Sequence, residues 1–220
     1  MSRALRITTE PTTQPVSDAD MELWLRTDAG VNAVDQPLIH QLIIAARKRI
    51  EGIQSRALAT QTVQLEHFLD KPLGGKLSGP IEQPINWYEF QEQLGANPFG
   101  ATAFYFDLPM SPVQSITTVE YMITVFDAAW TPWPALNANN QANYVLDQTK
   151  EPARLFMNTP VTALRWRFTY QAGYEGVNFI IPDDTIALLK RMVAFMYDNR
   201  DAAIPDELLL EATGRRNSWL

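Results

Sequence analysis

The side chains that most often carry out catalysis or bind metals are few and scattered in this sequence. His40 is predicted to lie on a helix and His67 on a strand, and neither has metal-ligand spacing to another histidine. Asp183 and Asp184 could act as paired carboxylates in acid–base chemistry. They follow Pro182 at a predicted helix start, where carboxylates stabilise the positive end of the helix dipole, so we favour a capping role. These residues predict no catalytic centre, no metal site and no bound cofactor.

Two glycine-containing segments could be compared with phosphate-binding loops. Residues 173–176 are too sparse in glycine for such a loop, and no Lys-Ser or Lys-Thr pair follows them. Residues 74–78 contain two glycines and a lysine but lack the spacing of a Walker loop. No serine lies in a Gly-x-Ser-x-Gly elbow. A small hydrolase that uses Asp or Glu residues is therefore the least supported interpretation.

The C-terminal tail is the most distinctive candidate site. It consists of Gly214, Arg215, Arg216, Asn217, Ser218, Trp219 and Leu220. Tryptophan and arginine commonly anchor protein interfaces, because each buries a large area and makes directed contacts. Chain ends are also commonly frayed, which is the alternative interpretation. We favour an interface, and we expect these seven residues to bind a partner protein.

Composition and charge limit the classes of protein that this sequence can represent. The chain has 220 residues, of which 46% are hydrophobic and 20% charged, as is typical of a folded, soluble protein. Its net charge of −7 disfavours nucleic-acid binding, which requires clustered lysines and arginines. It contains no cysteine, which excludes disulfides and thiolate metal sites and fits synthesis in a reducing compartment. We find no signal peptide and no apolar run of the ~18 residues that a membrane span needs, so we expect no membrane association.

Cap residues and apolar periodicity predict four helices. Ser17 is a predicted N-cap, and its helix is expected to end at Gly30. A long helix follows Asp35, with Pro37 in its first turn and a broad apolar stripe. The stripe contains Leu38, Leu42, Ile43, Ala46, Ile50 and Ile53, widened by Ile39 and Ile44. Arg47, Lys48 and Arg49 are expected to stabilise the C-terminal half of this helix dipole. Two further helices are predicted over 182–199 and 205–212.

The middle of the chain has the alternation and composition of β-strands. The strands are predicted over 60–68, 103–108, 116–125, 144–147, 153–157 and 163–170. In the last of these, Trp166 and Phe168 face one side while Arg165 and Arg167 face the other, which is typical of a half-exposed antiparallel strand. The segment 70–100 holds five of the ten glycines and several aromatic residues, so we interpret it as a long, aromatic-anchored insertion.

The predicted fold class is α+β: a helical bundle built from N- and C-terminal helices, with an inserted antiparallel β-sheet. We expect one domain over 1–220. Its parts are an extended arm (1–15), a helical segment (16–58), a β-rich insert with the long loop (59–173, loop 70–100), a second helical segment (182–213) and the tail (214–220).

A set of short stretches, in this order along nearly the whole chain, matches a known pattern. They are Pro15-Val16-Ser17, Leu25-Arg26-Thr27-Asp28, Leu38-Ile39, Ala45-Ala46-Arg47, Ser55-Arg56-Ala57-Leu58, Gln61-Thr62, Leu108-Pro109, Pro112-Val113-Gln114-Ser115-Ile116, Tyr144, Asp147, Pro152, Arg154-Leu155, Phe168-Thr169-Tyr170-Gln171-Ala172-Gly173-Tyr174, Ile181-Pro182 and Tyr197-Asp198-Asn199-Arg200. Through them the sequence resembles the head–tail connector (adaptor) proteins of tailed bacteriophages and related gene-transfer particles. It departs from that pattern in the length of 70–100 and in Asp201, where the family often has Glu.

The resemblance implies a structural role in the neck of a virion, after synthesis in the host cytoplasm. Subunits of this family form a ring, typically of twelve, beneath the portal protein. The ring extends the DNA channel, through which DNA passes without specific binding, and it carries the stopper or tail-completion protein. C-terminal segments of the family insert into the portal. For this chain the resemblance implies that Trp219 and Leu220 are apolar anchors and that Arg215 and Arg216 meet acidic groups of the portal.

A carbohydrate- or wall-binding module of a phage particle is the alternative from another class. It is suggested by four aromatic residues in predicted loops, Trp87, Tyr88, Trp130 and Trp133, because such rings can stack on sugars. Trp130 and Trp133 lie in a proline-containing turn between strands, so covering the sheet edge is an equally simple role for them.

Overall fold

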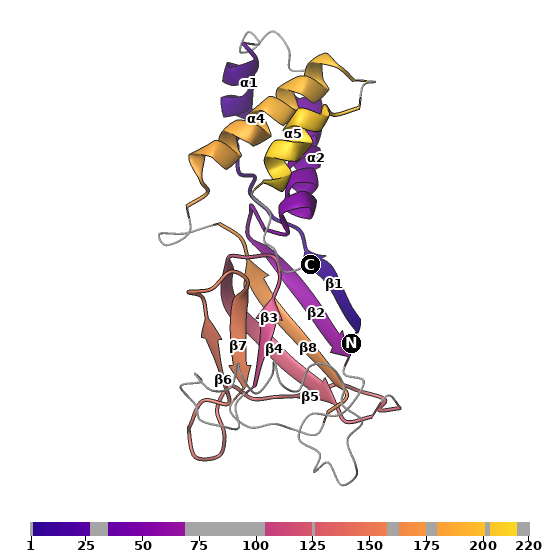
Figure 1. The fold of residues 1–220 in the computed structure, drawn as a ribbon, viewed down its shortest axis with the longest axis vertical. Coiled ribbons are helices and arrows are strands. Elements are labelled where there is room, and N and C mark those ends of the chain that lie inside the picture. Colours follow the sequence, from indigo (N-terminus) through magenta and orange to yellow (C-terminus); the bar gives the residue numbers. More distant parts are fainter. Residues whose placement is uncertain are drawn as a thin grey trace. The chain divides into compact units, whose positions relative to one another are not determined.

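The computed structural model describes residues 2–26, 35–68, 104–124, 126–157, 163–174, 180–200 and 203–214 (Figure 1). In chain order its elements are β1 (Ser2–Thr9), α1 (Asp18–Leu25), α2 (Gln36–Gln54), β2 (Gln61–Phe68), β3 (Phe104–Leu108), β4 (Val113–Met122), β5 (Thr131–Pro132), β6 (Tyr144–Asp147), β7 (Ala153–Met157), β8 (Arg165–Ala172), α4 (Asp183–Asp198) and α5 (Asp206–Thr213). The protein is therefore α+β, as predicted. Within the described ranges, no helix is long and apolar enough to cross a membrane.

The chain divides into two compact units, each built from three separate segments. The β unit comprises Met1–Thr8, Val63–Leu108 and Gln114–Gln171. The helical unit comprises Thr9–Thr62, Pro109–Val113 and Ala172–Leu220.

The β unit contains two sheets packed face to face. One has the strand order β1-β2-β8-β4-β5 and the other the order β3-β7-β6, with β7 antiparallel to both of its neighbours (Figure 1). Phe106 of β3 joins the two sheets, because its ring lies 4.6 Å from Phe168 and 5.9 Å from Trp166, both on β8. Apolar residues from both sheets form this core, including the fully buried Val63, Leu108, Leu155, Trp166 and Phe168.

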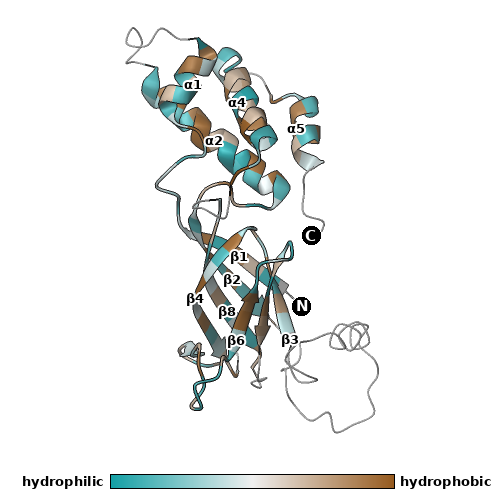
Figure 2. Ribbon diagram, turned by 90° about the vertical axis from the view of Figure 1, so that its left-hand side faces the viewer, coloured by the Kyte–Doolittle hydropathy of each residue, from teal (hydrophilic) through white to brown (hydrophobic). Residues whose placement is uncertain are grey.

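The helical unit has a core of its own, to which all four described helices contribute. Ile39, Ile43 and Ile50 of α2 are buried there with Leu188 and Met192 of α4. Met21 of α1 and Ala212 of α5 belong to the same buried set, and both α1 and α5 pack against α2 and α4. Figure 2 shows the apolar residues interleaved with polar ones along α2 and α4, the pattern expected of helices with one buried face.

Most predicted elements are confirmed, with β6 and β7 at their predicted bounds. Ser17 is the N-cap of α1, and its Oγ accepts a hydrogen bond from the Asp20 backbone N–H at 3.1 Å. That helix ends at Leu25 rather than at Gly30, because Arg26 adopts a left-handed conformation at the C-cap. Gly30 and the loop 70–100 lie outside the described residues.

The N-terminal segment differs from the prediction in an informative way. Ser2–Thr9 is extended, as expected of the arm, but it is a strand of the larger sheet. Arg3 contacts His67, and Arg6 contacts Gln64. Residue numbers therefore rise along β1 while those of the partners fall along β2. The two strands are therefore antiparallel. The two-residue strand β5 was also not predicted.

Gly173 occupies a position that requires glycine. Its φ is +132°, and an added Cβ would lie 2.4 Å from the carbonyl oxygen of Ala59. Its N–H donates to the Pro112 carbonyl at 2.8 Å. The segment considered above as a sparse phosphate loop thus begins with a close backbone contact inside the helical unit.

Candidate functional site

The predicted tail begins at a well-held helix end. Gly214 is the C-cap of α5, with φ −59° and ψ −14°, and its N–H donates to Leu210 at 3.0 Å. Ala212 is buried in the helical core, and Glu211 forms an ion pair with Arg191 of α4. The other predicted residues, Arg215, Arg216, Asn217, Ser218, Trp219 and Leu220, lie outside the described part of the chain. The structure therefore describes the helix end from which residues 215–220 continue.

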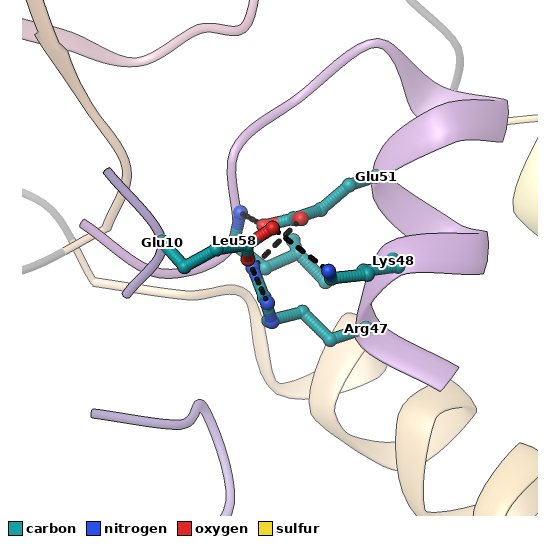
Figure 3. A network of polar contacts seen from close by, with 5 residues as sticks. All are labelled: Glu10, Arg47, Lys48, Glu51 and Leu58. Carbon is teal, nitrogen blue, oxygen red and sulfur yellow. Dashed lines mark hydrogen bonds and ion pairs between the residues drawn. The ribbon is translucent and has the colours of Figure 1, made fainter. Parts of the chain in front are cut away.

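A buried ionic cluster holds the chain between β1 and α1 against α2 (Figure 3). The Arg47 side chain is only 1% exposed, and its two terminal nitrogens lie 3.0 Å from carboxylate oxygens of Glu51 and Glu10. Lys48 Nζ lies 2.7 Å from the other Glu10 oxygen. Glu51, also buried, accepts the backbone N–H of Leu58 at 2.8 Å. One guanidinium thus joins the N-terminal segment, α2 and the segment that leads into β2.

The two carboxylates of this cluster have pKa values shifted in opposite directions. Burial raises the pKa of Glu51, and the nearby charge of Arg47 opposes that rise. The hydrogen bond from Lys48 lowers the pKa of Glu10, which is half exposed. From the sequence, Arg47 was predicted only to stabilise the helix dipole, and this cluster was not predicted. The signal was the spacing of Arg47 and Glu51, four residues apart on a predicted helix.

The outer face of β8 carries a second set of ion pairs. Arg165 pairs with Glu66 of β2 at 3.2 Å, and Arg167 pairs with Glu120 of β4 at 2.7 Å. The guanidiniums of Arg165 and Arg167 also lie 5.1 and 4.3 Å from the centre of the Trp130 ring. The predicted division of this strand is confirmed, since Trp166 and Phe168 are buried on its other face.

The aromatic residues considered for carbohydrate binding are engaged within the protein where they are described. Trp130 lies against the two arginines of β8. Trp133 makes edge contacts with Tyr121 and Trp166, at ring distances of 5.8 and 6.1 Å. Trp87 and Tyr88 lie outside the described residues. Trp130 and Trp133 flank the short edge strand β5 and pack against opposite faces of β8, so both rings are used within the β unit.

Each of the two histidines makes a polar contact within the protein. His67 is buried in β2, its ring lies 5.3 Å from that of Phe106, and its Nε2 accepts a hydrogen bond from Arg3 Nε at 2.9 Å. Burial lowers the pKa of His67 to about 4, and the charge of Arg3 adds to this effect. His40 lies on α2 with its Nδ1 3.0 Å from a carboxylate oxygen of Asp18 on α1.

The Asp183 and Asp184 carboxylates considered for acid–base chemistry lie at a helix N-terminus, where they stabilise the helix dipole, and the N-cap itself is Pro182, which makes no side-chain cap. Asp183 and Asp184 occupy the first turn of α4, and Asp206 and Glu207 that of α5. Among the described residues, no group of three or more potential metal ligands is brought together. A surface recess of about 370 Å³ lies between α1 and α4, lined by Asp20, Leu23, Trp24, Arg26 and Lys190. Lys190 lies over the Trp24 ring there, at 5.4 Å.

Comparisons with known proteins give a consistent answer at the level of fold. No protein-family model and no curated protein sequence matches this chain. Solved structures do match it over nearly their whole length. A chain of the neck of an empty GTA particle, computed with C6 symmetry, matches with a TM-score of 0.63 and 15% identity, covering 99% of this chain and 97% of the other.

Two further solved structures have a similar fold. A chain of the virion of a native gene transfer agent (GTA) particle matches with a TM-score of 0.57 and 18% identity, covering 98% and 96% of the two chains. A chain of the neck of a native GTA particle, computed with C12 symmetry, matches with a TM-score of 0.51 and 16% identity, covering 97% of each. The similarity in fold therefore agrees with the resemblance to head–tail connectors, and this chain shares its fold with chains of gene transfer agent particles, two of them from the neck.

Proposed function

We propose that this chain is a structural head–tail adaptor of a tailed, phage-like particle. Copies of it form a ring beneath the portal, extend the DNA channel and carry the stopper or tail-completion protein. The observation that carries this proposal is the match in fold, over 99% of this chain, to a chain of a particle neck. The resemblance of the sequence to connector proteins supports the same function.

Ring formation is supported by the symmetry of the similar structures. The two neck structures were computed with C6 and C12 symmetry, and rotational symmetry of that kind describes closed rings. Twelve copies in the ring is the expectation from the family resemblance. We expect a structural role, because Asp183 and Asp184 lie in the first turn of α4, His67 is buried and His40 pairs with Asp18.

The charge of the chain suits a DNA conduit. Its net charge of −7 gives a wall that repels phosphates weakly, so duplex DNA slides past without being held. The part-buried arginines Arg165 and Arg167 on β8 are each paired with a carboxylate, which reduces their attraction for DNA.

Residues 214–220 are proposed to dock into the portal. Tryptophan and leucine at the end of this segment supply apolar contacts, and Arg215 and Arg216 supply charge. The helix α5, from which the tail continues, is fixed to α4 by the Arg191–Glu211 ion pair and by burial of Ala212. A short segment that leaves a fixed helix loses less conformational entropy on docking than one that leaves a mobile region.

The test is a truncation that removes residues 215–220 and keeps Gly214, because the Gly214 N–H caps α5. The truncated chain is expected to keep its circular dichroism spectrum and thermal transition and to lose attachment to portal-bearing capsids. Attachment at full affinity would show that the tail is not the docking segment. An image of the particle neck tests the function itself, and the absence of a ring of this chain below the portal would contradict it.

A further inference from the structure

The larger sheet has an open edge at β1. Among the described strands β1 pairs only with β2, so about half of its backbone N–H and C=O groups point away from the sheet. The side chains of residues 3–9 are all exposed. An exposed strand edge of eight residues can accept a strand from another chain.

Two apolar residues on β1 face inward and remain uncovered. The contacts of Arg3 with His67 and of Arg6 with Gln64 place Leu5 and Ile7 opposite Leu65 and Val63. Leu65 and Val63 are buried, whereas Leu5 is 44% and Ile7 39% exposed. The second sheet covers β2 and β8 through Phe106, which contacts His67 and Phe168, and the described strands leave β1 uncovered beside it.

The smaller sheet has an open edge at β6. This strand pairs only with β7 among the described strands, and its Val145 is 37% exposed. The Gln148 side chain, next to β6, donates to the backbone carbonyl of Gln114 on β4 at 2.8 Å. Because β3 lies over β2 and β8 while β6 lies beside β4, the edges β1 and β6 belong to opposite flanks of the β unit (Figure 1).

Each edge offers a charged group to a partner strand. Arg3 and Arg6 donate to the neutral groups His67 Nε2 and Gln64 Oε1, and within the described residues neither arginine lies in an ion pair. On β6, hydrogen bonds from Thr149 lower the pKa of Asp147, so its carboxylate is charged at neutral pH. Arg3 with the uncovered apolar residues of β1 therefore complements the Asp147 carboxylate and the exposed Val145 of β6, although Arg154 on β7 and Lys150 share that carboxylate.

We propose that β1 of one copy pairs with β6 of the next copy and that this strand pairing joins neighbouring subunits of the ring. The inference rests on the function proposed above. A ring needs a head-to-tail contact between two different surfaces of the same chain, and these two edges meet that requirement. The incoming β6 supplies backbone hydrogen bonds to β1, and its Val145 and Asp147, which share one face of the strand, lie beside Arg3, Leu5 and Ile7, which share one face of β1.

The chain has no cysteine, so cysteines introduced by mutation are its only thiols available for crosslinking. The double variant Leu5→Cys/Val145→Cys is incorporated into particles and treated with a short bis-maleimide linker, which tolerates a small shift in strand register. Linkage within one copy is excluded because the two residues lie on opposite flanks. We expect a ladder of covalent multimers on a denaturing gel. The matched control is Leu5→Cys/Ile123→Cys, since Ile123 is an exposed apolar residue of the β unit that does not lie on β6.

Imaging of the same particles separates the possible failures. A ring that yields the ladder with the first pair and no more than dimers with the control supports the strand pairing. A ring that yields no ladder with the first pair shows that other surfaces join the subunits and leaves the proposed function intact. Particles that lack a ring of this chain contradict the proposed function, and the strand pairing with it. Val145→Lys provides a second readout, because a lysine beside Arg3 on the same face of the extended sheet should reduce incorporation into the ring at least tenfold.

Discussion

Arg47 and Glu51 form an ion pair one helical turn apart on α2, with both side chains almost fully buried. Glu10 also pairs with Arg47, and the backbone N–H of Leu58 donates to Glu51. A buried guanidinium with this number of partners fixes the relative positions of three chain segments within the helical unit.

Arg47→Met is expected to destabilise the protein by about 3–5 kcal/mol, because it leaves the Glu51 carboxylate buried without its counter-charge. Urea unfolding monitored by tryptophan fluorescence measures the loss. Lys48→Met is the matched control: Lys48 contacts the same Glu10 but is half exposed, so its loss should stay within about 1 kcal/mol. Equal losses in the two variants would contradict the importance of the buried pair.

His67 should make the protein less stable in acid. Its folded-state pKa of about 4 lies below the ordinary histidine value of about 6.5, so the folded state favours the neutral ring. This contribution is fully present above pH 6.5 and is lost as the pH falls from 6.5 towards 4, by up to about 3 kcal/mol. His67→Gln keeps an acceptor for Arg3 and removes the titration, so the difference in unfolding free energy between the two proteins should change across this window. A difference that is constant with pH would contradict the assignment.

The two glycines Gly173 and Gly52 should respond to alanine in opposite ways. Gly173→Ala places a Cβ against the Ala59 carbonyl at a positive φ, and a loss of at least about 2 kcal/mol is expected. Gly52 lies in α2 with no atom within 4 Å of an added Cβ, so Gly52→Ala should stabilise the protein by about 0.5–1 kcal/mol. Thermal unfolding of both variants checks the pair, and a destabilised Gly52→Ala would be inconsistent with the open surroundings of that residue.

Trp219→Ala should weaken attachment to portal-bearing capsids by about 2 kcal/mol, which is roughly thirtyfold in affinity, if Trp219 is the main anchor of the tail. Asn217→Ala, in the same tail, is the control and should change affinity by less than threefold. The measurement is co-sedimentation with capsids over a range of protein concentrations. Comparable losses in the two variants would indicate that the tail binds without a single dominant residue.

Local signals in the sequence predicted most of the fold. The Ser17 cap, the apolar stripe of α2 and the alternation of Trp166 with Arg165 and Arg167 each depend on neighbouring residues, and the structure confirms all three. The strand β1 was missed because it is defined by pairing with residues about 60 positions later, through contacts such as Arg6–Gln64. The contact of Arg47 with Glu10 was missed for the same reason, since the two residues lie 37 positions apart. The tail, predicted from residue types alone, remains a prediction.

The division of the chain has a consequence for how such a protein can change over evolution. The polypeptide passes between the two units five times, after residues 8, 62, 108, 113 and 171. Neither unit is therefore a contiguous gene segment that a single insertion or deletion could add or remove. Excising residues 63–171 would take Pro109–Val113 out of the helical unit and leave β1 without β2 beside it. The two units are thus expected to be inherited together, and shuffling of one without the other should yield chains that do not fold.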